Sequence, residues 1–155
     1  MNKWRGKKGG MVIKVNLNKA YDRFRWRFIH QTLKLIGFPE KLNELIMNCV
    51  QASAMQVLWN GDKLEPFKPT RGIRQGEPLS PYLFVLGIER MGHMITEAVV
   101  VKDWRPIKVT RSGPGVAYLS FADDLMLFAE ASMEQAEVVG NILGTFCKVS
   151  GQKVN

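Results

Sequence analysis

The chain has 155 residues, of which 46% are hydrophobic and 23% charged, a composition typical of one soluble globular domain that excludes a disordered tail, a coiled coil or a collagen-like repeat. Its net charge of +8 is unevenly placed, because residues 1–27 hold nine basic side chains against Asp22 alone, whereas residues 28–155 hold 13 of each sign. We therefore separate a basic N-terminal segment, residues 1–10, from one domain, residues 11–155, and expect either a polyanionic partner or a solvated basic tail.

The first part of the domain predicts a strand and two helices. Apolar residues alternate over residues 11–16, as in a β-strand. Apolar side chains then recur every three or four residues over 26–36, and Gly37 follows where a helix would end in the left-handed conformation. Pro39 can open a second helix. Its expected buried stripe comprises Leu42, Leu45, Ile46 and Cys49.

The second part of the domain predicts two hairpins and two further helices. Residues 54–59 and 63–67 indicate strands joined by Asn60-Gly61, a dipeptide that accepts the positive φ angles of a tight turn. A helix is expected from Pro78 to about residue 99, and a second hairpin around residues 122–124. Ser132 and Gln135 form a capping-box pattern ahead of a last helix, which ends near Gly151. Helices mixed with antiparallel hairpins favour an α+β fold.

Neither a membrane nor a thiol site is expected. The longest apolar run, residues 82–88, is far short of the ~18 residues that span a bilayer, and the N-terminus lacks the apolar core of a secretory signal. We therefore expect an intracellular protein, nuclear or cytoplasmic, without a membrane partner. Cys49 and Cys147 stand alone, without zinc-ligand or disulfide spacing, and are expected to be buried small apolar residues.

Two segments could carry chemistry. Asp123 and Asp124 are adjacent at the tip of the second hairpin, between apolar strand residues. Such a pair either holds a hard divalent cation or forms a solvated turn. Residues 71–81 (RGIRQGEPLSP) form a loop with two glycines and two arginines ahead of a helix, which suits a phosphate or nucleotide but is also compatible with an ordinary loop.

Three motifs together resemble a known family. Residues 14–23 (KVNLNKAYDR), the loop 71–81 and residues 121–124 (FADD) are similar, in order and spacing, to successive motifs of reverse transcriptases from non-LTR, LINE-type retrotransposons. Residues 150–155 (SGQKVN) resemble the start of the next motif. The resemblance implies an RNA-directed DNA polymerase fold, the right-hand palm with an antiparallel sheet and packed helices, with part of the fingers and with the thumb absent.

The resemblance also implies roles for particular residues. Asp123 matches a metal-binding carboxylate and Asp124 its supporting neighbour. Two ions of Mg²⁺ or Mn²⁺ would serve nucleotidyl transfer. Tyr21 matches an aromatic residue beneath the sugar of the incoming nucleotide. The residues that match the loop contacting that nucleotide and the template are Arg74, Gln75 and Gly76. The implied partners are an RNA template, a DNA primer and deoxynucleoside triphosphates.

The chain departs from the family at Asn16, where the resemblance predicts the second metal-binding Asp. An amide is neutral and offers one acceptor oxygen, so the metal site is expected to be weakened. Asp22 lies beyond the strand and is expected to form a salt bridge near a helix start rather than replace it. Catalysis is therefore expected to be impaired, also because the thumb that grips the duplex is missing.

The alternative is a non-catalytic nucleic-acid-binding remnant. It would use the basic N-terminal segment, through contacts of the kind that Lys and Arg make with phosphates. The residues expected to make these contacts are Lys3, Arg5, Lys7 and Lys8.

Overall fold

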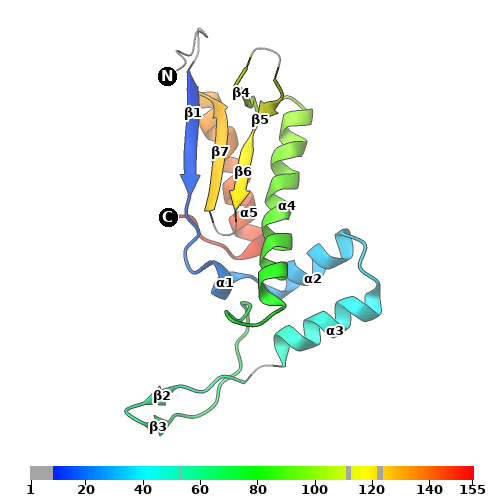
Figure 1. The fold of residues 1–155 in the computed structure, drawn as a ribbon, viewed down its shortest axis with the longest axis vertical. Helices are drawn as coiled ribbons and strands as arrows, with labels where there is room; N and C mark the ends of the chain where they lie inside the picture. The colour runs from blue at the N-terminus through cyan, green and yellow to red at the C-terminus, as the bar shows by residue number, and fades with distance from the viewer. Residues whose placement is uncertain (1–8, 53, 111–112, 122–123) are drawn as a thin grey trace.

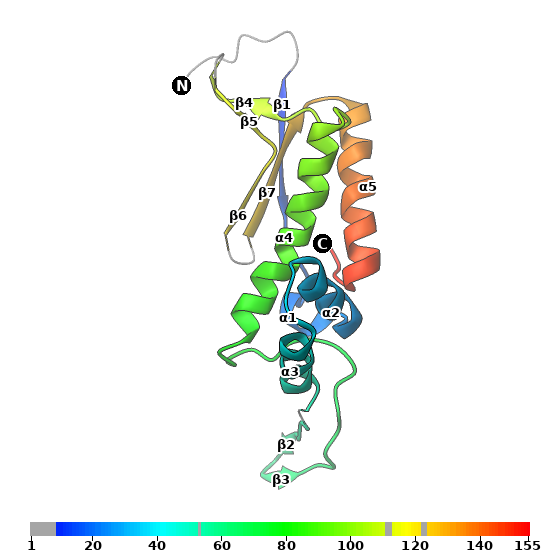
Figure 2. The same cartoon turned by 90° about the vertical axis from the view of Figure 1, so that its right-hand side faces the viewer.

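A three-stranded antiparallel sheet, backed by two long helices, forms the body of the molecule (Figure 1). The computed structural model describes residues 9–52, 54–110, 113–121 and 124–155. The strand order is β1 (Gly10–Val15), β7 (Asp124–Glu130) and β6 (Tyr118–Phe121). Helices α4 (Ser80–Val100) and α5 (Met133–Ser150) cover one face of this sheet, as Figure 2 shows from the side.

The register of the sheet follows the alternation of its sequence. β1 pairs with β7 from Gly10 opposite Glu130 to Val15 opposite Leu125, and β6 pairs with β7 up to Phe121 opposite Asp124. The residues that face the helices are buried: Val15 and Leu125 are each 1% exposed. The other face is open. Its apolar side chains remain solvent-accessible, and these are Val12, Leu119, Phe121 and Met126. The predicted strand and hairpin are both confirmed.

Three shorter helices lie beyond one end of the sheet (Figure 1). They are α1 (Ala20–Arg23), α2 (Trp26–Leu35) and α3 (Glu40–Gln51). Gly37, with φ of 91°, follows the end of α2, and α3 begins directly after Pro39. Both predicted helices are confirmed, whereas α1 was not predicted.

The predicted buried stripe of α3 is wrong by about one residue. Leu42 and Leu45 are 41% and 60% exposed, and the buried face is formed by Asn43, Ile46 and Met47. Asn43 tolerates burial because its Nδ2 donates to the carbonyl of His30 on α2, at 3.3 Å. Packing against α2 therefore buries a face of α3 that is rotated by about one residue from its most hydrophobic stripe.

The two cysteines also differ from the expectation. Cys49 is exposed and Cys147 is half-buried. Burial raises the pKa of the Cys147 thiol, an effect partly opposed by a hydrogen bond with the backbone of Val154. The prediction of two buried cysteines is thus wrong for Cys49. Cys49 is exposed because α3 turns a different face, that of Asn43, Ile46 and Met47, toward the core.

The first predicted hairpin is present and shorter than expected. It consists of β2 (Leu58–Trp59) and β3 (Asp62–Lys63), with an isolated bridge between Met55 and Phe67. The turn residues Asn60 and Gly61 have φ angles of 50° and 90°, which confirms the predicted turn. Both views show the hairpin projecting away from the sheet and helices (Figures 1 and 2).

The ends of α5 confirm the capping signals. Ser132 Oγ accepts the N–H of Gln135 at 3.3 Å, and Gly151 has φ of 85°. The Gln135 side chain does not return to Ser132, because it bridges the Asp103 carbonyl and the Arg105 N–H, at 2.8 and 2.6 Å. That bridge precedes a small hairpin that was not predicted, β4 (Ile107–Lys108) with β5 (Gly115–Val116).

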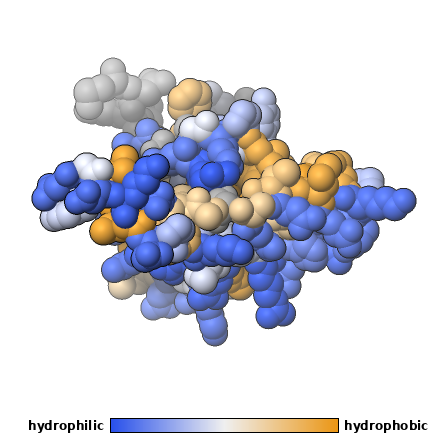
Figure 3. Space-filling model, turned by 90° about the horizontal axis from the view of Figure 1, so that it is seen from below, coloured by the Kyte–Doolittle hydropathy of each residue, from blue (hydrophilic) through white to orange (hydrophobic). Residues whose placement is uncertain are grey.

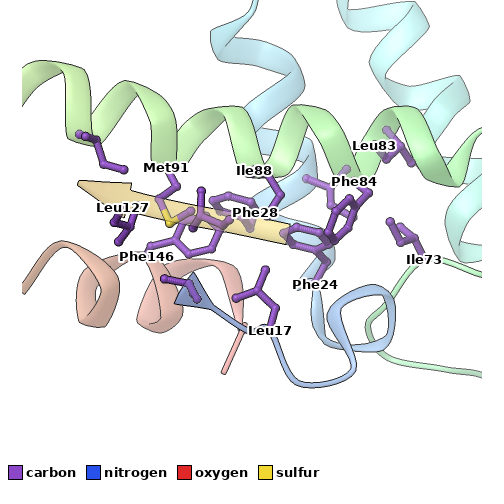
Figure 4. Close-up of a cluster of buried hydrophobic side chains, with 14 of the residues drawn as sticks. Leu17, Phe24, Phe28, Ile73, Leu83, Phe84, Ile88, Met91, Leu127 and Phe146 are labelled. Atoms are coloured by element: carbon purple, nitrogen blue, oxygen red, sulfur yellow. The ribbon is translucent and has the colours of Figure 1, made fainter. Parts of the chain in front are cut away.

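Aromatic side chains fill the space between the helices and the sheet (Figure 4). Phe24 lies 5.7 Å from Phe28 and 5.8 Å from Phe84, and Phe28 meets Phe146 of α5 edge-on at 5.9 Å. This cluster joins α2, α4 and α5 into one core. In the part of the chain that the structure describes, no helix is long and apolar enough to cross a membrane.

Candidate functional site

The end of β1 brings two of the predicted site positions together. Val15 lies opposite Leu125, so the next position of the antiparallel ladder places Asn16 beside Asp124. Asn16 and Asp124 are both exposed, and strand alternation puts them on the open face with Lys14. Two segments more than 100 residues apart in the sequence therefore meet at one end of the sheet.

Lys14 neutralises one carboxylate at this end of the sheet. Its Nζ lies 2.8 Å from Oδ1 of Asp124, and the two side chains are 66% and 63% exposed. Lys14 is two residues from Asn16, where the resemblance predicts a metal ligand, and alternation puts both side chains on the same face of the strand. Asp124 thus interacts with an ammonium group.

The other charged positions of the prediction fall outside the described residues. These are Asp123 at the hairpin tip and the N-terminal residues Lys3, Arg5, Lys7 and Lys8. Asp22 lies on α1 and is exposed. Among the ion pairs found within the described ranges, none includes Asp22, so the expected salt bridge is not formed there.

The donors described at this end do not suit a pair of hard cations. Asn16 offers a neutral amide, and the carboxylate of Asp124 is compensated by Lys14. Over residues 9–155, leaving aside 53, 111–112 and 122–123, no group of three His, Cys, Asp or Glu side chains is placed to hold a metal ion. Asp123, the first carboxylate of the predicted magnesium site, lies outside these ranges, so the site stays a prediction.

The last residues of the chain hold the backbone around Asn16. Leu17 pairs with Val154, and the Asn18 N–H donates to the Lys153 carbonyl at 2.8 Å. The Asn155 N–H donates to the Asn16 carbonyl at 3.1 Å. Sequence reasoning identified residues 150–155 only as a motif and missed this pairing, which no local signal indicates.

Gln152 adds a buried connection between the same tail and α1. Its side chain is 4% exposed, and its Nε2 donates to the Ala20 carbonyl at 2.7 Å. A buried side-chain amide is costly without such a partner. Gln152 therefore fixes the start of α1 relative to the end of β1.

Tyr21 and the loop 71–76 are also brought together. The Tyr21 ring stacks on Phe84 of α4, with centroids 4.7 Å apart and planes 5° apart. The Tyr21 carbonyl accepts the Ile73 N–H at 2.9 Å, and the Phe24 carbonyl accepts the Gly72 N–H at 2.7 Å. Backbone hydrogen bonds thus dock the loop on α1.

Gly72 makes this close approach possible. It has φ of 89°, and a Cβ there would lie 2.8 Å from the backbone oxygen of Asp22. The Trp26 indole Nε1 donates to the Gly72 carbonyl at 2.8 Å. We expected the loop glycines to let a ligand approach, but at Gly72 the space is filled by the backbone of Asp22. Gly76, with φ of 87° and open space around its Cβ direction, remains available for that role.

The predicted nucleotide-binding side chains lie beside a cleft of about 440 Å³. Arg74 and Gln75 both line it, and Arg74 is ion-paired with Glu77. The remaining lining comes from α1, α2, α3, the base of the first hairpin and the loop with the residues before it: Asp22, Trp26, Val50, Met55, Pro69, Arg71, Gly72 and Ile73. Figure 3 views the molecule from this end and shows polar and apolar side chains interspersed.

Comparison with protein families and curated proteins gives consistent matches. The model of the reverse transcriptase (RNA-dependent DNA polymerase) family matches residues 2–155. The Pol polyprotein of the type-2 retrotransposable element R2DM of Drosophila melanogaster is 29% identical over 144 residues, which cover 93% of this chain and 13% of that protein. A Pol polyprotein of the type-1 retrotransposable element R2 of Popillia japonica is 25% identical over 88% of this chain and 21% of its own length. The chain thus spans a small part of these relatives.

Solved structures share the fold. Telomerase from Candida albicans, determined in complex with a fragment of telomeric RNA, has a TM-score of 0.69 at 15% identity, over 94% of this chain and 26% of that one. Telomerase from Candida tropicalis gives the same TM-score at 14% identity, over 99% of this chain and 26% of that one. The likeness confirms the predicted α+β palm.

Proposed function

The chain belongs to the reverse transcriptase family, and we propose that it forms a template-binding palm in which metal-dependent nucleotidyl transfer is impaired at Asn16. The retrotransposon relatives confirm the predicted resemblance to reverse transcriptases of non-LTR elements. The observation that carries the proposal is the strand register, which ends with Val15 opposite Leu125 and leaves Asn16 and Asp124 at the adjoining positions, together with the ion pair between Lys14 and Asp124.

The impairment follows from charge. A hard divalent cation binds more weakly as carboxylate ligands are removed, and Asn16 supplies an amide where the family has Asp. Any cation must also displace the Lys14 ammonium from Asp124. Both effects act in the same direction, so we expect binding of Mg²⁺ or Mn²⁺ to be weak.

The nucleic-acid and nucleotide contacts are proposed on separate grounds. The open face of the sheet carries Lys14 among exposed apolar side chains such as Leu119 and Phe121, a combination suited to a phosphate backbone and bases. Arg74 and Gln75 share a cleft, which supports their assignment to the incoming nucleotide. On this proposal the ligands are an RNA template, a DNA primer and deoxynucleoside triphosphates.

Restoring the carboxylate tests the proposal. We expect no primer extension by the purified chain on an RNA template with Mg²⁺ or Mn²⁺, and at least about tenfold tighter Mg²⁺ binding after Asn16→Asp, measured by calorimetry. Asn18→Asp is the matched control, because it adds the same charge two residues along the chain. Extension by the unchanged chain that disappears on Asp123→Ala would contradict the impairment. Equal Mg²⁺ affinity of the Asn16→Asp and Asn18→Asp variants would contradict the site.

A non-catalytic nucleic-acid-binding remnant is the second candidate, favoured by the concentration of basic residues in the N-terminal segment. It predicts retention of RNA that weakens steeply with salt. Replacing Lys3, Arg5, Lys7 and Lys8 together with Gln should abolish this retention in a filter-binding assay. If retention persisted, contacts elsewhere in the chain would be responsible.

A further inference from the structure

The outer edge of β3 has backbone groups available for pairing. The Leu64 N–H donates to the Val57 carbonyl at 2.9 Å, and Gln56 Nε2 donates to the Leu64 carbonyl at 2.8 Å, so the backbone groups of Leu64 point toward β2. Successive residues of a strand direct these groups to opposite sides. Only Lys63 belongs to β3, and alternation along the extended segment 63–65 places the backbone groups of Lys63 and Glu65 on the outer edge, where they can pair with another strand.

One face of the same hairpin carries three exposed apolar side chains beside Asp62. Trp59 lies opposite Asp62, and the bond to Val57 places Leu64 on the same side. The exposed fractions are 66% for Trp59, 45% for Val57 and 48% for Leu64. The hairpin projects from the body in both views (Figures 1 and 2), and a two-stranded hairpin of this size has little stability of its own.

The charges of the hairpin disfavour a polyanion as its partner. Residues 54–68 contain Asp62 and Glu65 against Lys63 and Lys68, which sum to zero. Nucleic acids are bound by an excess of basic side chains. A neutral edge with one acidic and one basic residue, two positions apart, instead fits a polypeptide strand with the same arrangement in the reverse direction.

We propose that this edge is a self-association site, at which a second copy of the chain pairs antiparallel with residues 63–65, at the end of β3, about a twofold axis through Leu64. The pairing places Lys63 of each copy opposite Glu65 of the other, and Leu64 opposite Leu64. Opposite charges and apolar side chains that face each other across strands are both stabilising. Pro66 has no N–H and ends the pairing after Glu65.

The result is a four-stranded sheet that gathers exposed apolar side chains on one face, beside Asp62, with Leu58 on the opposite face. Val57, Trp59 and Leu64 of both copies lie on that face, whereas the Lys63–Glu65 pairs lie on the other, because side chains alternate along each strand. Contact areas this small support weak, transient complexes. The proposal does not depend on the polymerase function, since none of these residues belongs to the candidate functional site.

Charge reversal tests both the association and its register. Sedimentation equilibrium of the full chain, from about 5 to about 500 µM, should show a reversible monomer–dimer equilibrium. Lys63→Glu or Glu65→Lys alone places like charges opposite each other twice and should weaken the dimer at least about tenfold. The double variant Lys63→Glu/Glu65→Lys should restore it to within about threefold. Lys41→Glu, on an exposed position of α3, is the matched control and should have no effect.

Four results would overturn the proposal. A chain that is monomeric throughout the concentration range has no such site. A dimer indifferent to both single reversals uses another surface, and failure of the double variant to restore association excludes this register. Salt-sensitive retention of single-stranded RNA that is lost on Trp59→Ala, without change in the dimer, would assign the hairpin to nucleic acid instead.

Discussion

The docked loop and the end of β1 carry the two halves of the predicted site, and they differ in how they are built. At the loop, two backbone hydrogen bonds, an indole hydrogen bond and a glycine without room for a side chain fix Gly72 and Ile73 on α1. At the end of β1, Asn16 and Asp124 extend into solvent, and an ammonium group compensates one carboxylate. The first half depends on packing, whereas the second depends on charge.

The difference explains how Asn16 can stand where the resemblance predicts Asp without disturbing the fold. The position of Asn16 is set by the pairing of its neighbour Val15 with β7 and by the Asn155 N–H, which donates to the Asn16 carbonyl. Neither contact involves its side chain. A change from carboxylate to amide therefore alters the chemistry of the site and leaves the backbone that carries it unchanged.

The largest effect on stability is expected at Gly72. Gly72→Ala combines an unfavourable positive φ with a Cβ placed 2.8 Å from the Asp22 oxygen, and should lower the free energy of unfolding by about 3 kcal/mol. Gly76→Ala is the control: it has nearly the same φ, but nothing lies within 4 Å of its Cβ direction, so it should cost only about 1–2 kcal/mol. Urea unfolding measures both. Equal losses would mean that the loop is not docked on α1.

A smaller effect is expected where α4 packs on Phe24, the residue whose carbonyl receives the Gly72 N–H. A Cβ on Gly87 would lie 2.6 Å from the buried Phe24 ring. Gly87→Ala should therefore destabilise by about 1–2 kcal/mol, because overpacking outweighs the gain in helix propensity. Gly140→Ala, in α5 with open space around it, should stabilise by up to about 1 kcal/mol. Thermal unfolding measures both variants. A higher melting temperature for Gly87→Ala would show that the Phe24 ring can move aside at little cost.

The smallest effect is expected at the charged half. Lys14→Met removes an ion pair whose side chains are 66% and 63% exposed, and should change the free energy of unfolding by less than about 0.5 kcal/mol. Lys34→Met, which removes the exposed pair with Glu40 at 2.9 Å, provides the comparison. A loss of about 2 kcal/mol at Lys14 alone would show that the charged half also supports the fold, and the contrast between the two halves would fail.

Local signals predicted most of the secondary structure because their causes are local. Asn60-Gly61 has the positive φ angles that the turn requires, and Ser132 caps α5 within three residues. The face of α3 was mispredicted because α3 has apolar residues on two adjacent sides, and burial of Asn43 depends on a carbonyl of another helix, that of His30. No pattern within α3 contains that information.

The same distinction applies to the candidate site. The spacing of the motifs indicated which segments meet, and the sheet register brings Asn16 beside Asp124. The contacts that hold those segments were not predicted, namely the tail pairing at Leu17 and the docking of Gly72 on α1. They are backbone hydrogen bonds between distant residues, and any sequence can supply the donor and acceptor.

The pairing of residues 152–155 with residues 16–18 has a consequence for synthesis. The Asn16 carbonyl accepts the N–H of Asn155, and the Ala20 carbonyl accepts the side-chain amide of the buried Gln152. During translation, β1 and α1 therefore emerge long before the residues that hold them. Contacts of such sequence separation form slowly, so the backbone around Asn16 and Ala20 should become ordered only after residues 152–155 have left the ribosome.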